Sequence, residues 1–134
     1  MKILSNDRSE YIEIKRKPEE KYFFENIEDY PFYTIEANFG NFRGFNNSIS
    51  WHNLDRFVHD LDLYISDRQQ KVKLTGTYNF CLEIYSQSNT SQLKLEMSGE
   101  KYPHQFDLRG GFVLDDEYLN TYLEDFKKFK NWIN

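Results

Sequence analysis

Apolar and polar residues alternate along most of this chain, and the alternation predicts β-strands. Side chains spaced in this way point to opposite faces of a half-buried sheet. The alternating segments cover residues 11–15, 32–39, 71–75, 78–85, 92–97 and 104–114, with residues 3–4 as a short strand beside 11–15. Because no long crossovers separate successive strands, we expect antiparallel pairing.

Turn-forming residues separate the predicted strands. Gly40-Asn41 is expected to turn the chain into a second hairpin arm at residues 42–45, and Ser86 to Ser91 to form a hairpin loop. Gly110-Gly111 suggests a bulge or bend in the last strand. Residues 19–29 show neither period, so we expect a long loop or an irregular strand there.

Two segments instead repeat apolar residues every three or four positions, which predicts amphipathic helices at about 51–66 and 116–131. Ser48 or Ser50 can cap the first helix. Its expected apolar stripe consists of Trp51, Leu54, Val58, Leu61 and Ile65, widened by Phe57 and Tyr64. The second helix begins beside Asp115-Asp116-Glu117 and ends among lysines, an order that complements the helix dipole.

Together these elements predict a single α+β domain over residues 1–134, an antiparallel β-sheet or curled β-sandwich with both helices packed on it. Aromatic residues make up 18% of the chain, so we expect an aromatic-rich core. The formal charge of −5 argues against a nucleic-acid partner. The single cysteine, Cys81, favours a reducing compartment. With no signal peptide or membrane-length apolar stretch apparent, we predict a cytoplasmic protein without a membrane partner.

The polar pattern that first suggests chemistry lies on the first predicted helix, where His52, Asp55, His59 and Asp62 fall at i, i+3, i+7 and i+10. Two helical turns separate the histidines, so one metal ion could not be held by both. We interpret the stripe as the solvated flank of the helix, or as a weakly acidic face for a partner. Cys81 lies in an alternating strand without a histidine near it in sequence, so we read it as structural. We assign no residue to catalysis, to a metal or to a cofactor.

A series of mostly apolar and small residues follows the order of the predicted elements. It consists of Gly44-Phe45, then Ser48, Trp51, Leu54, Phe57 and Leu61, then Leu74-Thr75-Gly76, Phe80-x-Leu82, Leu93-x-Leu95 and Leu114-Asp115-Asp116-x-Tyr118-Leu119. In this order, from about Tyr33 to Leu123, the chain resembles the WapI-like immunity proteins of bacterial polymorphic and contact-dependent toxin systems. The resemblance implies a cytoplasmic protein that binds the toxin domain encoded beside it and blocks the active site of that domain. No catalytic residues belong to such a function.

Charge and expected exposure, rather than a motif, suggest which residues would contact such a partner. Many toxins of this kind are nucleases with basic clefts, towards which an acidic surface would be steered. The candidate contacts are His52, Asp55, His59, Asp60 and Asp62 on the first helix, and Glu25, Glu28 and Asp29 in the acidic segment before residue 32. Two alternatives stay open. One is a small-molecule-binding or enzymatic domain with a pocket in the mouth of the curled sheet, and the other is a structural subunit of a larger assembly.

Overall fold

The computed structural model describes residues 1–17, 32–99 and 107–131. These residues form two antiparallel sheets of four strands, in the orders β1-β2-β3-β4 and β5-β6-β7-β8, together with two α-helices and a short 3-10 helix. Consecutive strands are therefore neighbours throughout both sheets. The predicted α+β class and the antiparallel pairing are confirmed.

The first sheet contains β1 (Lys2–Leu4), β2 (Tyr11–Arg16), β3 (Tyr33–Phe39) and β4 (Phe42–Ile49). The predicted pairing of the first two strands is present, with Ile3 opposite Ile12. Phe39 pairs with Phe42 across the expected turn, where Gly40 adopts a φ of 75°. Glycine suits that turn because the left-handed conformation costs it nothing. The alternation of the sequence is followed closely in β2, where Ile12 and Ile14 are fully buried.

The second sheet contains β5 (Val72–Thr75), β6 (Cys81–Gln87), β7 (Thr90–Ser98) and β8 (Asp107–Val113). The loop expected at 86–91 is shorter than predicted, because only Ser88 and Asn89 lie between β6 and β7. Both residues have positive φ, at 52° and 65°. This is the backbone of a two-residue hairpin turn whose twist matches that of its strands.

Two details of the second sheet differ from the sequence-based prediction. First, β6 begins at Cys81 rather than at residue 78, because Tyr78 and Asn79 both adopt a φ of 56° and form part of a turn. Second, the expected bulge at Gly110-Gly111 is absent from the described register, which runs without a shift from Gln92 opposite Val113 to Ser98 opposite Asp107. The two glycines are therefore needed for another reason, namely close packing.

The first predicted helix starts later than expected. Helix α1 spans Leu54–Ser66, whereas Trp51 forms a β-bridge with Gly76 and the His52 N–H donates to the carbonyl of Thr75. Neither proposed serine caps the helix, since its N-cap is Asn53, which makes no side-chain capping bond. Pairing with the chain around Thr75 keeps residues 51–52 extended, and this tertiary pairing overrides the helical period of the sequence.

Asn53 uses its side chain to fasten the start of α1 to the second sheet. Its Oδ1 accepts a hydrogen bond from the backbone N–H of Thr75 at 2.8 Å, and its Nδ2 donates to the carbonyl of Lys73 at 2.9 Å. The second helical segment matches its prediction better. Asp115 accepts from the N–H of Glu117 at 3.0 Å, a 3-10 turn η2 (Asp116–Tyr118) follows, and α2 spans Leu119–Asn131.

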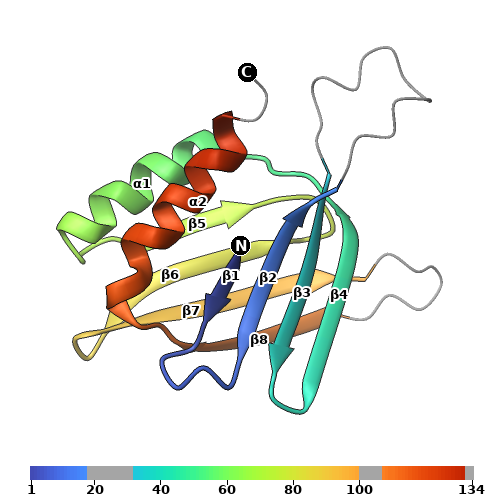
Figure 1. The fold of residues 1–134 in the computed structure, drawn as a ribbon, viewed down its shortest axis with the longest axis horizontal. Coiled ribbons are helices and arrows are strands. Elements are labelled where there is room, and N and C mark those ends of the chain that lie inside the picture. The colour runs from blue at the N-terminus through green and yellow to red at the C-terminus, as the bar shows by residue number, and fades with distance from the viewer. Residues whose placement is uncertain (18–31, 100–106, 132–134) are drawn as a thin grey trace.

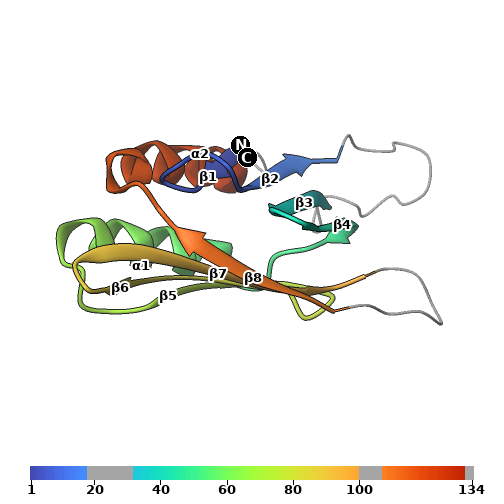
Figure 2. The same cartoon turned by 90° about the horizontal axis from the view of Figure 1, so that it is seen from below.

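The elements are arranged as a sandwich with one helical side. Figure 1 shows β1–β4 and the two helices in front of β5–β8, with α2 alongside β1. In the turned view of Figure 2, β5–β8 form one layer, α1 lies on its inner side, and α2 and the first sheet lie above. The hydrophobic core fills the space between them and takes buried residues from every strand and from both α-helices, while the half-buried Tyr118 of the 3-10 helix packs against it. Each sheet consequently has one face that the described residues leave uncovered.

Small residues let the two sheets approach each other. A Cβ atom on Gly110 would collide with the ring of Phe39, and one on Gly44 would collide with the side chain of Leu108. Between the sheets, the fully buried Asn46 donates from Nδ2 to the carbonyl of Ser98 at 2.8 Å. This hydrogen bond joins the two sheets directly.

Within the described ranges, none of the helices has both the length and the apolar character that crossing a membrane requires.

Candidate functional site

Helix α1 carries four of the eight candidate contacts on its polar face. Asp55, His59 and Asp62 are exposed on the helix, while His52 is exposed in the extended segment before it. Asp60 is half-buried. It forms an i,i+4 ion pair with Arg56, whose Nε lies 3.2 Å from its Oδ2, and the Asp55 carboxylate lies 3.8 Å from Lys130 Nζ of α2. The candidate contacts Glu25, Glu28 and Asp29 lie outside the described residues.

A hydrophobic side chain lies on this polar face. Leu63 is 57% exposed, although the buried side of α1 consists of Phe57, Val58, Leu61 and Tyr64. It borders an open groove of about 270 Å³ between the C-terminal half of α1 and the start of β5. The groove is lined by Asp60, Leu63, Tyr64, Ser66, Asp67, Gln69, Gln70, Lys71 and Val72. An exposed leucine beside a polar groove is a site where a partner could bury apolar surface.

The basic groups next to this groove already have partners. Arg68 donates from Nη1 to the Tyr64 carbonyl at 3.3 Å and also lies over the Tyr64 ring. Lys71 lies 3.3 Å from a carboxylate oxygen of Glu83. By contrast, within the described part of the chain the carboxylates of Asp62 and Asp67 show no ion pair. The charge available to a partner at this end of α1 is therefore negative.

The candidate histidines do not form a metal site. His52 precedes α1 and His59 lies inside it, so the predicted stripe of four residues on one helix is wrong at His52, and only Asp55, His59 and Asp62 belong to the helix. Among the described residues, no group of three or more His, Cys, Asp or Glu side chains is placed to hold a metal ion.

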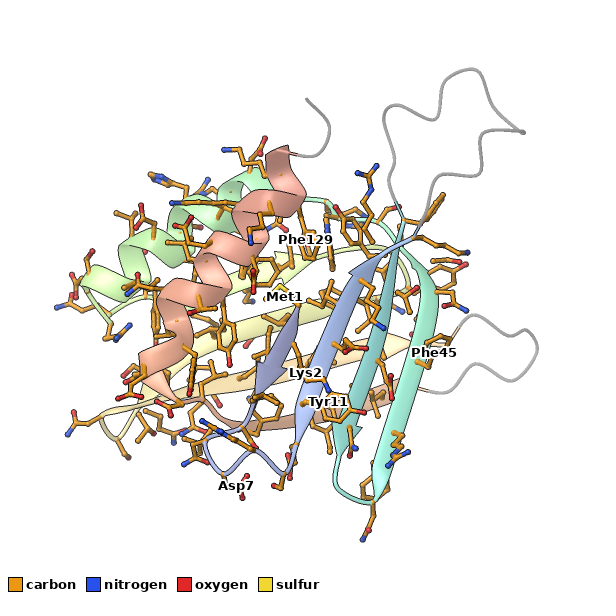
Figure 3. All side chains as sticks on the ribbon, in the orientation of Figure 1. Met1, Lys2, Asp7, Tyr11, Phe45 and Phe129 are labelled. Carbon is orange, nitrogen blue, oxygen red and sulfur yellow. The ribbon has the colours of Figure 1, made fainter. Side chains whose placement is uncertain are left out.

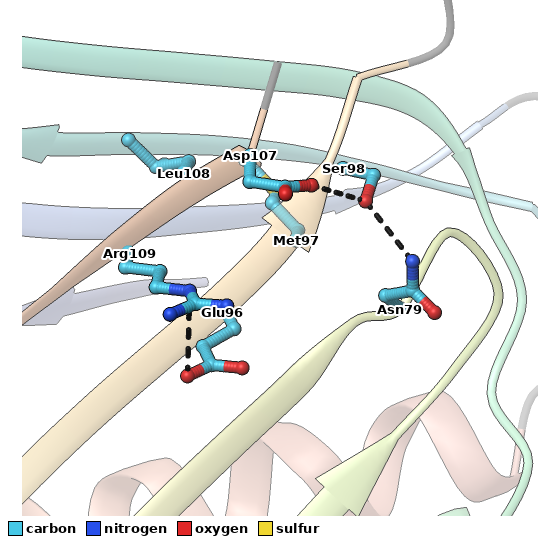
Figure 4. Close-up of a pocket in the computed structure, with 7 residues that line it drawn as sticks. All are labelled: Asn79, Glu96, Met97, Ser98, Asp107, Leu108 and Arg109. Carbon is cyan, nitrogen blue, oxygen red and sulfur yellow. Dashed lines mark hydrogen bonds and ion pairs between the residues drawn. The ribbon is translucent and has the colours of Figure 1, made fainter. Parts of the chain in front are cut away.

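A second pocket, of about 260 Å³, lies at the end of the second sheet (Figure 4). There Asn79 Nδ2 donates to Ser98 Oγ at 3.1 Å, and Ser98 Oγ donates to Asp107 Oδ1 at 2.8 Å. On the same wall, Arg109 Nε lies 3.8 Å from Glu96 Oε1. Its described lining includes no histidine that could act as a base towards Ser98. The polar side chains of this pocket thus bond one another, and we interpret them as structural groups that hold the end of the second sheet together.

Cys81 has the surroundings of a structural thiol. It is half-buried on β6, and its Sγ lies 4.0 Å from Glu83 Oε1. Burial raises the pKa of the Cys81 thiol, and the negative charge of Glu83 raises that pKa further. Reactive cysteines need the opposite environment, one that stabilises the thiolate. The geometry therefore offers no activation of this sulfur.

The outer face of the first sheet is a further uncovered surface, and Figure 3 shows Lys2, Tyr11 and Phe45 on it. Lys2 Nζ lies 4.4 Å from the centre of the Tyr11 ring, and Lys15 lies 3.2 Å from Glu13. Phe45 is 49% exposed on β4. Basic side chains, from Lys2, Lys15 and Arg43, outnumber the acidic ones on this face, Glu13 and Glu36. The net charge of this face is thus positive, whereas the charge available beside Leu63 is negative.

Searches with family models, curated proteins and solved structures found no match for this chain. Sequence reasoning placed the polar face of α1 but overlooked Leu63 and Asp67. The sequence contained a signal for both residues. Leu63 falls outside the apolar stripe, and no basic residue in the last turn of the helix balances the acidic Asp67 that follows it.

Proposed function

We propose that this protein is an immunity protein, which binds a cognate bacterial toxin domain and occludes its active site. The observation that carries the proposal is the exposed, acidic polar face of α1, interrupted by an exposed leucine. Interfaces combine apolar contact area with a charged rim, and complementary charges accelerate the encounter of the partners. The resemblance to WapI-like immunity proteins supplies the class of partner.

The interior of the protein also supports a role in binding rather than in transformation of a small molecule. Apolar side chains from both sheets and both helices fill the space between the layers. The two pockets described above are open and hold about 260 and 270 Å³, whereas small-molecule sites typically enclose roughly 300–1,000 Å³. In the pocket beside Asn79, the polar groups of Asn79, Ser98 and Asp107 bond one another, as do those of Arg109 and Glu96, which favours the binding of a protein over that of a small polar ligand there.

The proposal is tested by co-expressing the chain with the toxin domain encoded beside it and counting surviving cells. We expect the wild-type protein to restore growth and to form a complex measurable by titration calorimetry. Changing Asp55, Asp60 and Asp62 together to Lys should weaken protection and slow association, because the α1 face would then repel a basic cleft.

A matched control changes net charge equally on other surfaces. It replaces three exposed glutamates with Lys. These are Glu96, Glu117 and Glu124, all of which lie outside α1 in the sequence. This control should retain protection. Absence of both rescue and complex formation with the wild-type protein would refute the immunity function.

A further inference from the structure

We infer that the partner is held at the C-terminal end of α1, where a basic, amphipathic segment of the partner places an apolar side chain against Leu63 and its cations beside Asp62 and Asp67. This inference rests on the proposed function and deepens it. It names the surface and the chemistry of the group that binds there.

Leu63 is an exposed apolar residue within the polar face of α1. Its neighbours one helical turn away are His59, Asp60 and Asp67, so a leucine that is 57% exposed is surrounded by polar groups. Core packing does not require Leu63, because α1 buries a different set of residues against the sheet and against α2. The adjacent groove of about 270 Å³ gives an incoming side chain a place to lie between α1 and the start of β5.

Acidic residues lie close to the C-terminus of α1, where they oppose the helix dipole. Backbone carbonyls at the C-terminus of a helix carry partial negative charge, so acidic side chains there are unfavourable for folding. Yet Asp62 lies immediately before the last turn of α1 and Asp67 immediately after it, and that turn contains no basic residue. Arg68, beyond the helix, offsets part of this charge through the Tyr64 carbonyl. Helix α2 follows the favourable order, with Lys128 and Lys130 in its last turn.

Surface residues that make their own helix less stable, as these aspartates do, indicate selection for a property other than stability. Cations supplied by a partner would relieve this conflict, since each carboxylate would then have a counter-charge near the negative end of the helix. The exposed aromatic face of the first sheet is less suitable for the same partner. Phe45 lies opposite Glu36 and two positions from Arg43 on β4. A basic segment would therefore meet one cation and one carboxylate beside Phe45, whereas the end of α1 offers carboxylates that form no ion pair among the described residues.

The test compares matched variants by titration calorimetry against the toxin domain encoded beside this chain. Leu63→Ser should weaken binding by tenfold or more, whereas Phe45→Ser, a comparably exposed residue on the other face, should change it by less than about twofold. Hydrogen exchange of the wild-type complex should show protection at residues 60–72. Each of these changes is at an exposed position, so the fold is expected to persist, and circular dichroism checks this.

The two aspartates provide a readout that a purely structural role would not give. Asp62→Asn and Asp67→Asn should leave the melting temperature unchanged or raise it, because they relieve the repulsion at the helix end, while they slow association at low salt. If Leu63→Ser binds like the wild type, or if Phe45→Ser abolishes binding instead, the groove is not the interface although the immunity function stands. If the wild-type protein binds no toxin, both proposals fall.

Discussion

The hydrogen bond between the two sheets offers the sharpest test of how this fold is held together. Asn46 is fully buried on β4; its Nδ2 donates to the Ser98 carbonyl, and its Oδ1 accepts from the Ser48 N–H, both at 2.8 Å. Leaving a buried donor or acceptor without its partner costs about 1–3 kcal/mol. Since Asn46→Ala removes both bonds, we expect it to lower the free energy of unfolding by about 2–4 kcal/mol.

This loss is measurable by urea denaturation followed by circular dichroism, and it should lower the melting temperature by roughly 10 °C. The matched control is Asn120→Ala on the exposed side of α2, which should change the free energy of unfolding by less than about 0.5 kcal/mol. An Asn46→Ala variant as stable as the Asn120→Ala control would show that the bond between the sheets contributes nothing net.

A third variant separates the hydrogen bond from the volume of the side chain. Asn46→Asp preserves the shape but places a carboxylate where the amide donated to the Ser98 carbonyl, so it should be at least as destabilising as Asn46→Ala at neutral pH. Protonation of that carboxylate would restore a donor. Burial beside a carbonyl would raise the pKa of that carboxyl, so the deficit should shrink as the pH falls from neutral towards about 4, the ordinary value for aspartate. A deficit independent of pH would contradict this account.

Three further outcomes follow from the packing and the pKa shifts. Trp51→Ala should cost on the order of 3 kcal/mol in the free energy of unfolding, because the Trp51 ring lies 4.8 Å from that of Tyr33 and 5.1 Å from that of Phe80; an unchanged urea midpoint would contradict that packing. Cys81 should react with a thiol reagent at neutral pH much more slowly in the folded protein than in urea, since burial raises its pKa, and equal rates would count against the structural assignment. Burial also raises the pKa values of Tyr33 and Tyr122 above 10.0. The fold should therefore be fully stable below pH 10 and should lose stability as the pH rises through the raised pKa values. Phenolate absorbance in the ultraviolet measures this: two tyrosines should ionise later than the others, at the pH at which the protein unfolds.

The strands could be predicted well because their information is local. Alternation in segments such as β2 and β7 reports directly which side chains are buried, and short polar links leave few ways to join them other than antiparallel hairpins. Turn geometry was less accessible. Tyr78 and Asn79 look like strand residues in the sequence, yet both occupy the left-handed region in the structure.

The start of α1 could not be found from the sequence because it depends on a distant segment. Trp51 fits the helical stripe, but its backbone pairs with Gly76, which lies 25 positions later in the sequence. Ser50 likewise meets Thr77 rather than the helix, since its N–H donates to Thr77 Oγ1 at 2.9 Å. The candidate interface shows the same limit. Its aspartates were visible in the sequence, whereas the groove beside Leu63 exists only once β5 is placed next to α1.

The contact between α2 and β1 bears on how this protein avoids aggregation. β1 is an edge strand of the first sheet, and its Leu4 N–H donates to the Tyr122 hydroxyl of α2 at 3.1 Å. An unpaired N–H on a sheet edge is a template on which another chain can add a strand. By accepting this hydrogen bond, Tyr122 satisfies the edge N–H and keeps α2 against the edge strand. Chains in which α2 has detached would thus expose a strand ready to pair with a neighbour, so docking of the helix protects the solubility of the sheet as well as its stability.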